Sequence, residues 1–192
     1  WEETGEAQMA ALVDAGLRPD HVLLDIGAGS LRLGCRAVPY LAPGHYWATD
    51  ASRAILLAGH GMELEDPGLL DPAQLIEDAD FAFPGVPDTI THALCFAVFP
   101  HLPAEYIRRP LETLRRFPRL EKYLFTVFLA PDAASCATPY RQRDGVVTHA
   151  HRPPYHLLES SLREMAEETG WRLDRDDRKL PRGQVLFTAT RD

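Results

Sequence analysis

The stretch Leu24-Asp25-Ile26-Gly27-Ala28-Gly29-Ser30 decides the fold, and a further glycine, Gly34, follows it. Its first three residues are the end of the apolar run 21–26, whose valine, leucine and isoleucine residues are typical of a buried parallel strand. Two glycines directly after a strand allow a tight turn, and we expect a helix over 30–38 and a second strand over 45–50. The predicted order is therefore strand, glycine turn, helix and strand, and the second strand ends on an acidic residue.

The same alternation continues over the rest of the chain. We expect helices over 6–15, 51–59, 104–117 and 157–169, and strands within 75–83, ending near Asp80, and over 89–96, 121–129, 171–173 and 184–190. Pro110 must kink the third of these helices or begin its second half. Alternating strands and helices favour an α/β fold with a mainly parallel sheet and helices on both of its faces.

Length and composition indicate one globular domain. The 192 residues are 45% hydrophobic and 25% charged, which is enough for one hydrophobic core. We expect a single domain over 1–192 that begins with an N-terminal helix within 1–17. Residues 131–156 lack clear periodicity and are rich in Pro, Arg, His and Thr. Long connections of this kind commonly form lids or substrate walls, so we expect this segment to be a substrate loop.

The sequence also bears on location and redox state. No run of about 20 apolar residues is present, and residues 1–8 are acidic, so we expect a soluble, cytoplasmic protein with no membrane partner. The three cysteines have no metal-type spacing, which predicts reduced, structural thiols.

The net charge of −8 argues against a nucleic-acid partner, because nucleic-acid-binding proteins usually display a basic surface. One basic cluster lies within 108–119, but its leucines are interleaved at helical spacing. A solvated helix face explains it better than an RNA-binding track.

The glycine motif indicates the type of ligand. A pyrophosphate-binding fingerprint requires a third glycine three residues after Gly29, where this chain has Arg32. The spacing Asp-x-Gly-x-Gly-x-x-x-x-Gly instead resembles the first motif of class I S-adenosylmethionine-dependent methyltransferases. An acid, Asp50, follows at the ~20-residue offset at which a carboxylate binds ribose hydroxyls. In the alternative interpretation the glycines only shape a turn, and Asp50 caps the following helix.

The resemblance implies the fold, the cofactor and a set of cofactor-binding residues. The fold would be a doubly wound, mostly parallel seven-stranded sheet, and the cofactor S-adenosyl-L-methionine, with S-adenosyl-L-homocysteine as product. The acid of the motif would accept from the cofactor's ammonium group, Asp50 would bind both ribose hydroxyls, and Asp80 and Phe81 would contact adenine. The implied residues are Asp25, Gly27, Ala28, Gly29, Asp50, Ala51, Asp80, Phe81, Cys95 and Phe96.

The segment 95–103 looks like the fourth-strand region of these enzymes. At the strand end, Cys95 and Phe96 replace the polar or acidic residue that is usual there. The chain also lacks the Asn/Asp-Pro-Pro-aromatic motif of enzymes that methylate the amino groups of nucleic-acid bases. Both features argue against a base as the acceptor.

Methyl transfer to a hydroxyl or phenol calls for a general base, and a neutral histidine with a pKa near ~6.5 suits this role. We expect the catalytic candidates His101, His151 and His156, and the substrate-binding candidates Phe99, His149, Arg152 and Tyr155. An equally good interpretation of His101 is a solvent-facing residue at the start of a helix. The loop histidines have no cysteine or clear carboxylate partner for a zinc site, so we expect no metal.

The predicted function is S-adenosylmethionine-dependent methylation of a small-molecule acceptor, on oxygen, in specialised metabolism. The alternatives are methylation of nitrogen or carbon on a small or carrier-bound molecule, and a non-catalytic pseudoenzyme that only binds the cofactor. The acceptor pocket would lie between the N-terminal helix, residues 99–101 and residues 135–156. We allow for a homodimer, which the sequence does not decide.

Overall fold

A computed structural model of the chain describes residues 1–191. The chain forms two compact units. The first unit comprises residues 1–95 and 113–123, and the second comprises residues 96–112 and those from 124 onwards. Within residues 1–191, no helix combines the length and the apolar character needed to cross a bilayer.

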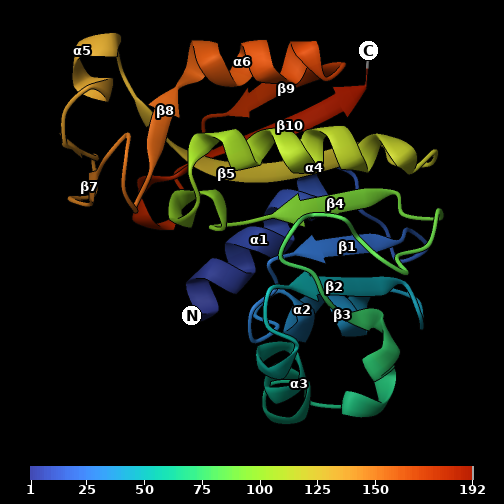
Figure 1. The fold of residues 1–192 in the computed structure, drawn as a ribbon. Helices are drawn as coiled ribbons and strands as arrows, with labels where there is room; N and C mark the ends of the chain where they lie inside the picture. Colours follow the sequence, from blue (N-terminus) through green and yellow to red (C-terminus); the bar gives the residue numbers. More distant parts are fainter. Residues whose placement is uncertain (192) are drawn as a thin grey trace. The chain divides into compact units, whose positions relative to one another are not determined.

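A parallel sheet forms the centre of the first unit. Its strands, in spatial order, are β3 (Leu75–Glu77), β2 (Tyr46–Asp50), β1 (Leu23–Ile26) and β4 (His92–Cys95). The arrows of β1, β2 and β4 point the same way in Figure 1. Asp25 lies opposite Ala48 of one neighbouring strand and Leu94 of the other. All four residues of β1 are buried, which explains the continuous apolar run in the sequence.

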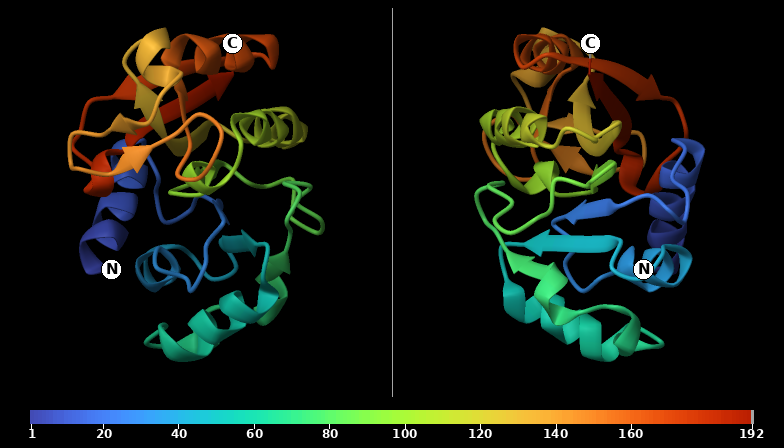
Figure 2. Two further views of the ribbon diagram at one scale, coloured as in Figure 1. Left: turned by 60° about the vertical axis from the view of Figure 1, so that its left-hand side comes forward. Right: turned by 90° about the vertical axis from the view of Figure 1, so that its right-hand side faces the viewer.

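Three helices accompany this sheet: α1 (Glu2–Asp14), α2 (Gly34–Tyr40) and α3 (Arg53–Met62). Helix α3 begins after Ser52, whose hydroxyl accepts from the Ile55 backbone N–H, and it packs against β2 and β3 (Figure 2). Helix α1 contacts α2, where Arg36 and Glu2 form an ion pair of 2.6 Å. Short 3₁₀ helices lie at Pro67–Leu69 (η1), Pro72–Gln74 (η2) and Leu114–Arg116 (η5).

The second unit contains a mixed set of strands. They are β5 (Lys122–Ala130), which enters it from the first unit, β8 (His156–Leu158), β9 (Trp171–Asp176) and β10 (Val185–Arg191). Strand β8 runs parallel to the end of β5, whereas β9 and β10 are antiparallel. Helix α6 (Glu159–Glu168) packs against β8 and β9 (Figure 1).

The expected helix over 104–117 is divided into three consecutive pieces. They are η4 (Ala104–Ile107), α4 (Arg108–Thr113) and η5, and a further 3₁₀ helix, η3 (Phe99–His101), precedes them. Pro110 lies in the first turn of α4, where its missing N–H costs no helical hydrogen bond. The helical piece that contains Pro110 begins two residues before it, at Arg108.

Residues 131–156 have more regular structure than we expected. A short helix, α5 (Ala133–Cys136), begins at Asp132, whose carboxylate accepts from the Ser135 N–H at 2.8 Å. A hairpin of β6 (Tyr140–Arg141) and β7 (Val147–Thr148) follows, and Gly145 in its turn has a φ of +97°. An N-cap and a turn glycine thus organise this segment locally.

The predicted mixed α/β class with a mostly parallel sheet is confirmed. Each of the seven expected strands is present, and β6, β7 and β8 are additional. Three helices start later than predicted: α2 at Gly34, α3 at Arg53 and α6 at Glu159. The delay is longest for α2, because Leu31 has a φ of +61° and residues 30–33 form turns. The strand expected near Asp80 ends earlier, at Glu77.

Gly59 is the point at which α3 touches the glycine turn. A Cβ at this position would lie 2.5 Å from the backbone carbonyl of Ser30. We expect Gly59→Ala to lower the free energy of unfolding by about 1–3 kcal/mol, although alanine has the higher helix propensity, because backbone atoms must move. Urea denaturation measures this loss. Gly61→Ala is the matched control, since a Cβ there meets no atom within 4 Å. Equal effects of the two substitutions would contradict the close approach.

Candidate functional site

The glycine turn after β1 is fixed to the end of β2. The backbone N–H groups of Gly27 and Ala28 both donate to the Thr49 carbonyl, at 2.8 and 3.0 Å. Gly27 and Gly29 have φ values of +70° and +55°, in the left-handed region that favours glycine. A Cβ added to Gly29 would meet no atom within 4 Å. The backbone at Gly29 therefore borders open space that a ligand can enter.

Asp50 connects this turn to the start of α3. Its Oδ2 accepts from the Gly29 N–H at 2.9 Å, and its Oδ1 accepts from the Ser52 N–H at 3.0 Å. The helix cap itself is Ser52, so Asp50 is not the N-cap of our alternative interpretation. Each carboxylate oxygen can accept more than one hydrogen bond, and the residue is partly exposed. Asp50 can thus hold the turn and, at the same time, bind hydroxyl groups of a ligand.

Asp25 lies buried at the end of β1, where its Oδ2 accepts from the Tyr46 hydroxyl at 2.7 Å. Burial raises the pKa of Asp25 to about 7, the Tyr46 hydrogen bond opposes this rise, and the charge of Asp50 adds to it. Gly34 makes room for the pair, because a Cβ there would lie 3.1 Å from the Tyr46 hydroxyl. The third glycine of the motif thus has a packing role.

Asp78 organises the loop after β3, and the sequence analysis missed it. Its carboxylate accepts from the backbone N–H groups of Asp80, Ala82 and Phe83 at 3.0, 3.2 and 2.8 Å. Its own N–H donates to the Asp50 carbonyl at 2.8 Å. Asp80 is exposed and Phe81 is buried, and Phe81 has a φ of +57°. An aspartate directly after a strand is a turn signal that could have identified this residue.

Cys95 ends β4 and is buried, and burial raises the pKa of its thiol, with the charge of Asp25 adding to the rise. The parallel register places the carboxyl ends of all four strands at one edge of the first unit's sheet. The predicted cofactor residues that gather at this edge are Asp25, Gly27, Ala28, Gly29, Asp50, Ala51, Asp80, Phe81 and Cys95. Phe96 belongs to the second unit.

Several predicted acceptor-site residues gather in the second unit. The Tyr155 N–H donates to the Pro100 carbonyl at 2.7 Å, and His149 and Tyr155 form an isolated β-bridge. Phe99, Tyr155 and His156 line a cavity of about 10 Å³, which is enough for one water molecule. His101, His151 and Arg152 are exposed. Desolvation and then the charge of Arg152 lower the pKa of His149.

His156 has a position unlike that of the other candidate bases. It is buried, its Nδ1 lies 2.8 Å from the Thr148 hydroxyl, and its Nε2 lies 3.1 Å from the Cys136 carbonyl. Both ring nitrogens are thus engaged by the β6–β7 hairpin and α5, which favours a structural role. Among residues 1–191, no group of three or more His, Cys, Asp or Glu side chains is arranged to hold a metal ion.

A second buried network fixes the segment that leads to His101. Ala97 has a φ of +59°, and its N–H donates to the Thr126 hydroxyl at 2.8 Å. That hydroxyl donates in turn to the Gln184 side-chain carbonyl at 2.6 Å. Sequence reasoning missed Thr126 and Gln184, because nothing local links residues 58 positions apart.

Solved structures with a similar arrangement of helices and strands include several methyltransferases. Magnesium protoporphyrin IX methyltransferase from Synechocystis PCC 6803 with bound SAH has a TM-score of 0.68 and 17% identity, covering 100% of this chain and 83% of that one. Burkholderia thailandensis 1,6-didemethyltoxoflavin-N1-methyltransferase has a TM-score of 0.68 and 16% identity, covering 99% of this chain and 79% of that one. The glycopeptide N-methyltransferase MtfA has a TM-score of 0.66 and 17% identity, covering 100% of this chain and 92% of that one. No protein-family model matches the sequence, and no curated protein matches it. The chain has the fold of class I S-adenosylmethionine-dependent methyltransferases.

The raised pKa of Asp25 predicts a dependence of stability on pH. The folded-state pKa of about 7 exceeds the ordinary value of 3.8, so protonation of Asp25 stabilises the folded protein. This stabilisation is fully present below pH 3.8 and is lost as pH rises through 7. Asp25→Asn is neutral at every pH. We expect wild type to lose stability relative to this variant between pH 4 and 7, by at most about 1.4 kcal/mol per pH unit, in urea denaturation.

The buried histidine His92 also makes stability depend on pH, in the opposite direction. Comparing wild type with the variant removes this contribution. Burial lowers the pKa of His92 from 6.5 to about 4, so its stabilisation is present above 6.5 and is lost as pH falls. His92 is common to both proteins and cancels in their difference. A difference that stays constant from pH 4 to 8 would contradict the burial of Asp25 as an acid with a raised pKa.

Proposed function

We propose that this chain transfers a methyl group from S-adenosylmethionine to a small-molecule acceptor. The observation that carries the proposal is the bond between the Asp50 carboxylate and the Gly29 N–H, beside backbone that borders open space. A partly exposed carboxylate next to a bare turn suits a ligand that presents hydroxyl groups and needs close backbone contact. The shared fold supports the same assignment, since related structures contain bound SAM or SAH.

The residues at the carboxyl edge of the first unit fit this cofactor. Asp50 would hold the ribose hydroxyls, the backbone of 27–29 would lie against the methionine part, and Asp80 with Phe81 would bind adenine. Asp25 is buried behind the turn and bonded to Tyr46, so it would act on the ammonium group from within the protein. When bound, the cofactor supplies a methyl group made electrophilic by its sulfonium sulfur.

The protein's own part in the reaction is alignment, exclusion of water and removal of a proton from the acceptor. His101 is our first candidate for the base, because it is exposed on η3 directly after the segment held by Thr126. His151, also exposed, is the second candidate. An imidazole nitrogen, Nε2 or Nδ1, would take the proton of an acceptor hydroxyl.

We propose oxygen as the methylated atom, and nitrogen is the second candidate. The observation that favours nitrogen is that two related structures are described as N-methyltransferases. A panel of acceptors that offer only hydroxyl groups or only amines, followed by mass analysis of the product, separates the two. Cofactor binding without product on either panel would favour a non-catalytic binding protein.

Removing the carboxylate of Asp50 should weaken cofactor binding. We expect Asp50→Ala to cost roughly 1.5–3 kcal/mol of binding free energy for S-adenosylhomocysteine in calorimetry, because charge-assisted hydrogen bonds are lost. Asp71→Ala is the control, since Asp71 is an exposed aspartate that also accepts from a backbone N–H two residues on. Unchanged affinity in Asp50→Ala, in a variant that remains folded, would remove Asp50 from the site.

Removing the proposed base should slow chemistry and leave binding intact. We expect His101→Ala to reduce the single-turnover rate on a phenolic acceptor by about 10²–10⁴-fold, with near-normal S-adenosylhomocysteine affinity. His151→Ala, an exposed histidine of the same unit, should retain most of the rate. A normal rate for His101→Ala would contradict the assignment.

A further inference from the structure

Helix α3 has an outer side of unusual composition. Residues 54–62 of this helix include no acidic residue, lysine or arginine. Only Leu56 and Gly59 of α3 are buried, and the helix lies at the outside of the first unit in both views of Figure 2. A surface helix normally turns charged and polar residues toward water, whereas an apolar outer side is typical of a helix that another element covers. The composition of α3 therefore indicates a contact surface.

The exposed residues on this side are apolar, and three of them are large. We call the following residues the outer face of α3: Ala54, Ile55, Leu57, Ala58, Gly61 and Met62. Met62 is 81% exposed, more than any other large hydrophobic side chain among residues 1–191, and Ile55 and Leu57 are 47% and 40% exposed. Single exposed hydrophobic residues are ordinary on a protein surface, but a contiguous apolar patch marks an interaction site.

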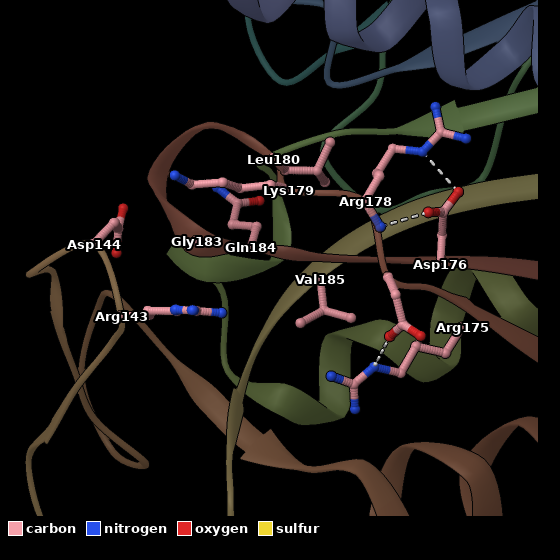
Figure 3. Close-up of a pocket in the computed structure, with 11 residues that line it drawn as sticks. Arg143, Asp144, Arg175, Asp176, Arg178, Lys179, Leu180, Gly183, Gln184 and Val185 are labelled. Atoms are coloured by element: carbon pink, nitrogen blue, oxygen red, sulfur yellow. Dashed lines mark hydrogen bonds and ion pairs between the residues drawn. The ribbon is translucent and has the colours of Figure 1, made fainter.

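Charged surface elsewhere in the chain is paired internally. In a cavity of about 400 Å³ in the second unit, Arg178 donates to Asp176 at 2.7 Å, and Arg175 lies 3.4 Å from Asp177 (Figure 3). Such side chains are satisfied by one another and by water. The apolar side chains of the outer face are stabilised only when they leave water, so a partner that covers them would lower their free energy.

The two ends of α3 carry charges of opposite sign. Arg53 is the first residue of the helix, and the exposed acids Glu63, Glu65 and Asp66 follow its last residue. Within residues 1–191, none of these four side chains forms an ion pair. The helix dipole adds partial charges of the same signs at the same ends. A second copy of α3 in the antiparallel direction would therefore place the basic end of each helix beside the acidic end of the other.

The outer face also matches a copy of itself in the sizes of its side chains. An antiparallel pair centred on Ala58 places Met62 opposite Ala54 of the second copy, and Ile55 opposite Gly61 of the second copy. A large side chain thus faces a small one on both sides of the centre. At the centre Ala58 would lie against its own copy, where a small residue allows the helices to approach closely.

We propose that α3 is the contact surface of a homodimer, in which the outer faces of two copies pack antiparallel about a two-fold axis near Ala58. A two-fold contact uses the same patch on both copies, so the patch must be complementary to itself. The outer face meets this condition, because it is free of charge along its length and oppositely charged at its ends. A parallel pair would instead bring the acids of residues 63–66 of both copies together, which like-charge repulsion disfavours.

The mass of the full chain in sedimentation velocity, over a range of protein concentrations, tests this proposal. We expect wild type to reach the mass of two chains, and Met62→Glu to associate at least roughly tenfold more weakly, because a charge would be buried in the contact. The high exposure of Met62 means that the substitution leaves the core intact. Val13→Glu is the matched control, since Val13 is a 43% exposed apolar residue of another helix, α1, in the same unit. It should dimerise as wild type does.

Oxidative cross-linking tests the direction of the two helices. In the antiparallel pair the two copies of residue 58 face each other, so Ala58→Cys should form a disulfide between chains. The two copies of residue 54 would lie about 12 Å apart along the helices, beyond the ~7 Å between Cα atoms that a disulfide spans. Ala54→Cys is therefore the control and should give no more cross-linking than wild type, whose three native cysteines define the background.

Other outcomes would overturn the proposal. A wild type that stays at the mass of one chain at the highest concentration would remove the dimer. Equal weakening in Met62→Glu and Val13→Glu would show association that does not depend on α3. Cross-linking of Ala54→Cys as readily as Ala58→Cys would contradict the antiparallel arrangement. These measurements require no cofactor, so their failure would leave the proposed methyltransferase function untouched.

Discussion

The bond between the Asp50 carboxylate and the Gly29 N–H is the interaction on which the site depends. It links the turn after β1 to the end of β2, and the second oxygen of the same carboxylate links β2 to the start of α3 through Ser52. Hydrogen bonds from backbone N–H groups to a charged acceptor are stronger than neutral ones. One side chain therefore fixes the left-handed turn, the strand end and the helix start in a single arrangement.

A second constraint lies directly behind this turn. Asp25 is buried, which raises its pKa to about 7, and the hydrogen bond that Tyr46 donates to it opposes this rise. Gly34 leaves the space that the tyrosine ring needs. The three residues explain why the motif has an acid before its glycines and a glycine well after them, in terms of packing as well as ligand binding.

Local sequence patterns predicted the order of helices and strands, whereas contacts between residues far apart in the sequence could not be predicted. The strand–turn–helix order around 21–50 was correct because apolar runs and glycines act locally. The left-handed Leu31, which delays α2, has no local signal in a residue that usually avoids that conformation. The hydrogen bonds of Tyr46 with Asp25 and of Thr126 with Gln184 join residues 21 and 58 positions apart, which one sequence cannot pair. The burial of the histidines in the long connection could not be predicted either, because only tertiary contacts make His156 buried and leave His151 exposed.

Binding of a ligand by Asp50 is tested most directly by the NMR spectrum of the backbone amides of Gly29 and Ser52 during titration with S-adenosylhomocysteine. Both amides donate to Asp50, so a ligand whose hydroxyls engage that carboxylate must change their environment. We expect large, saturable shifts at both amides, and none with a nicotinamide dinucleotide. Saturable binding that leaves the two amides unmoved, or the same shifts with the dinucleotide, would contradict this role of Asp50.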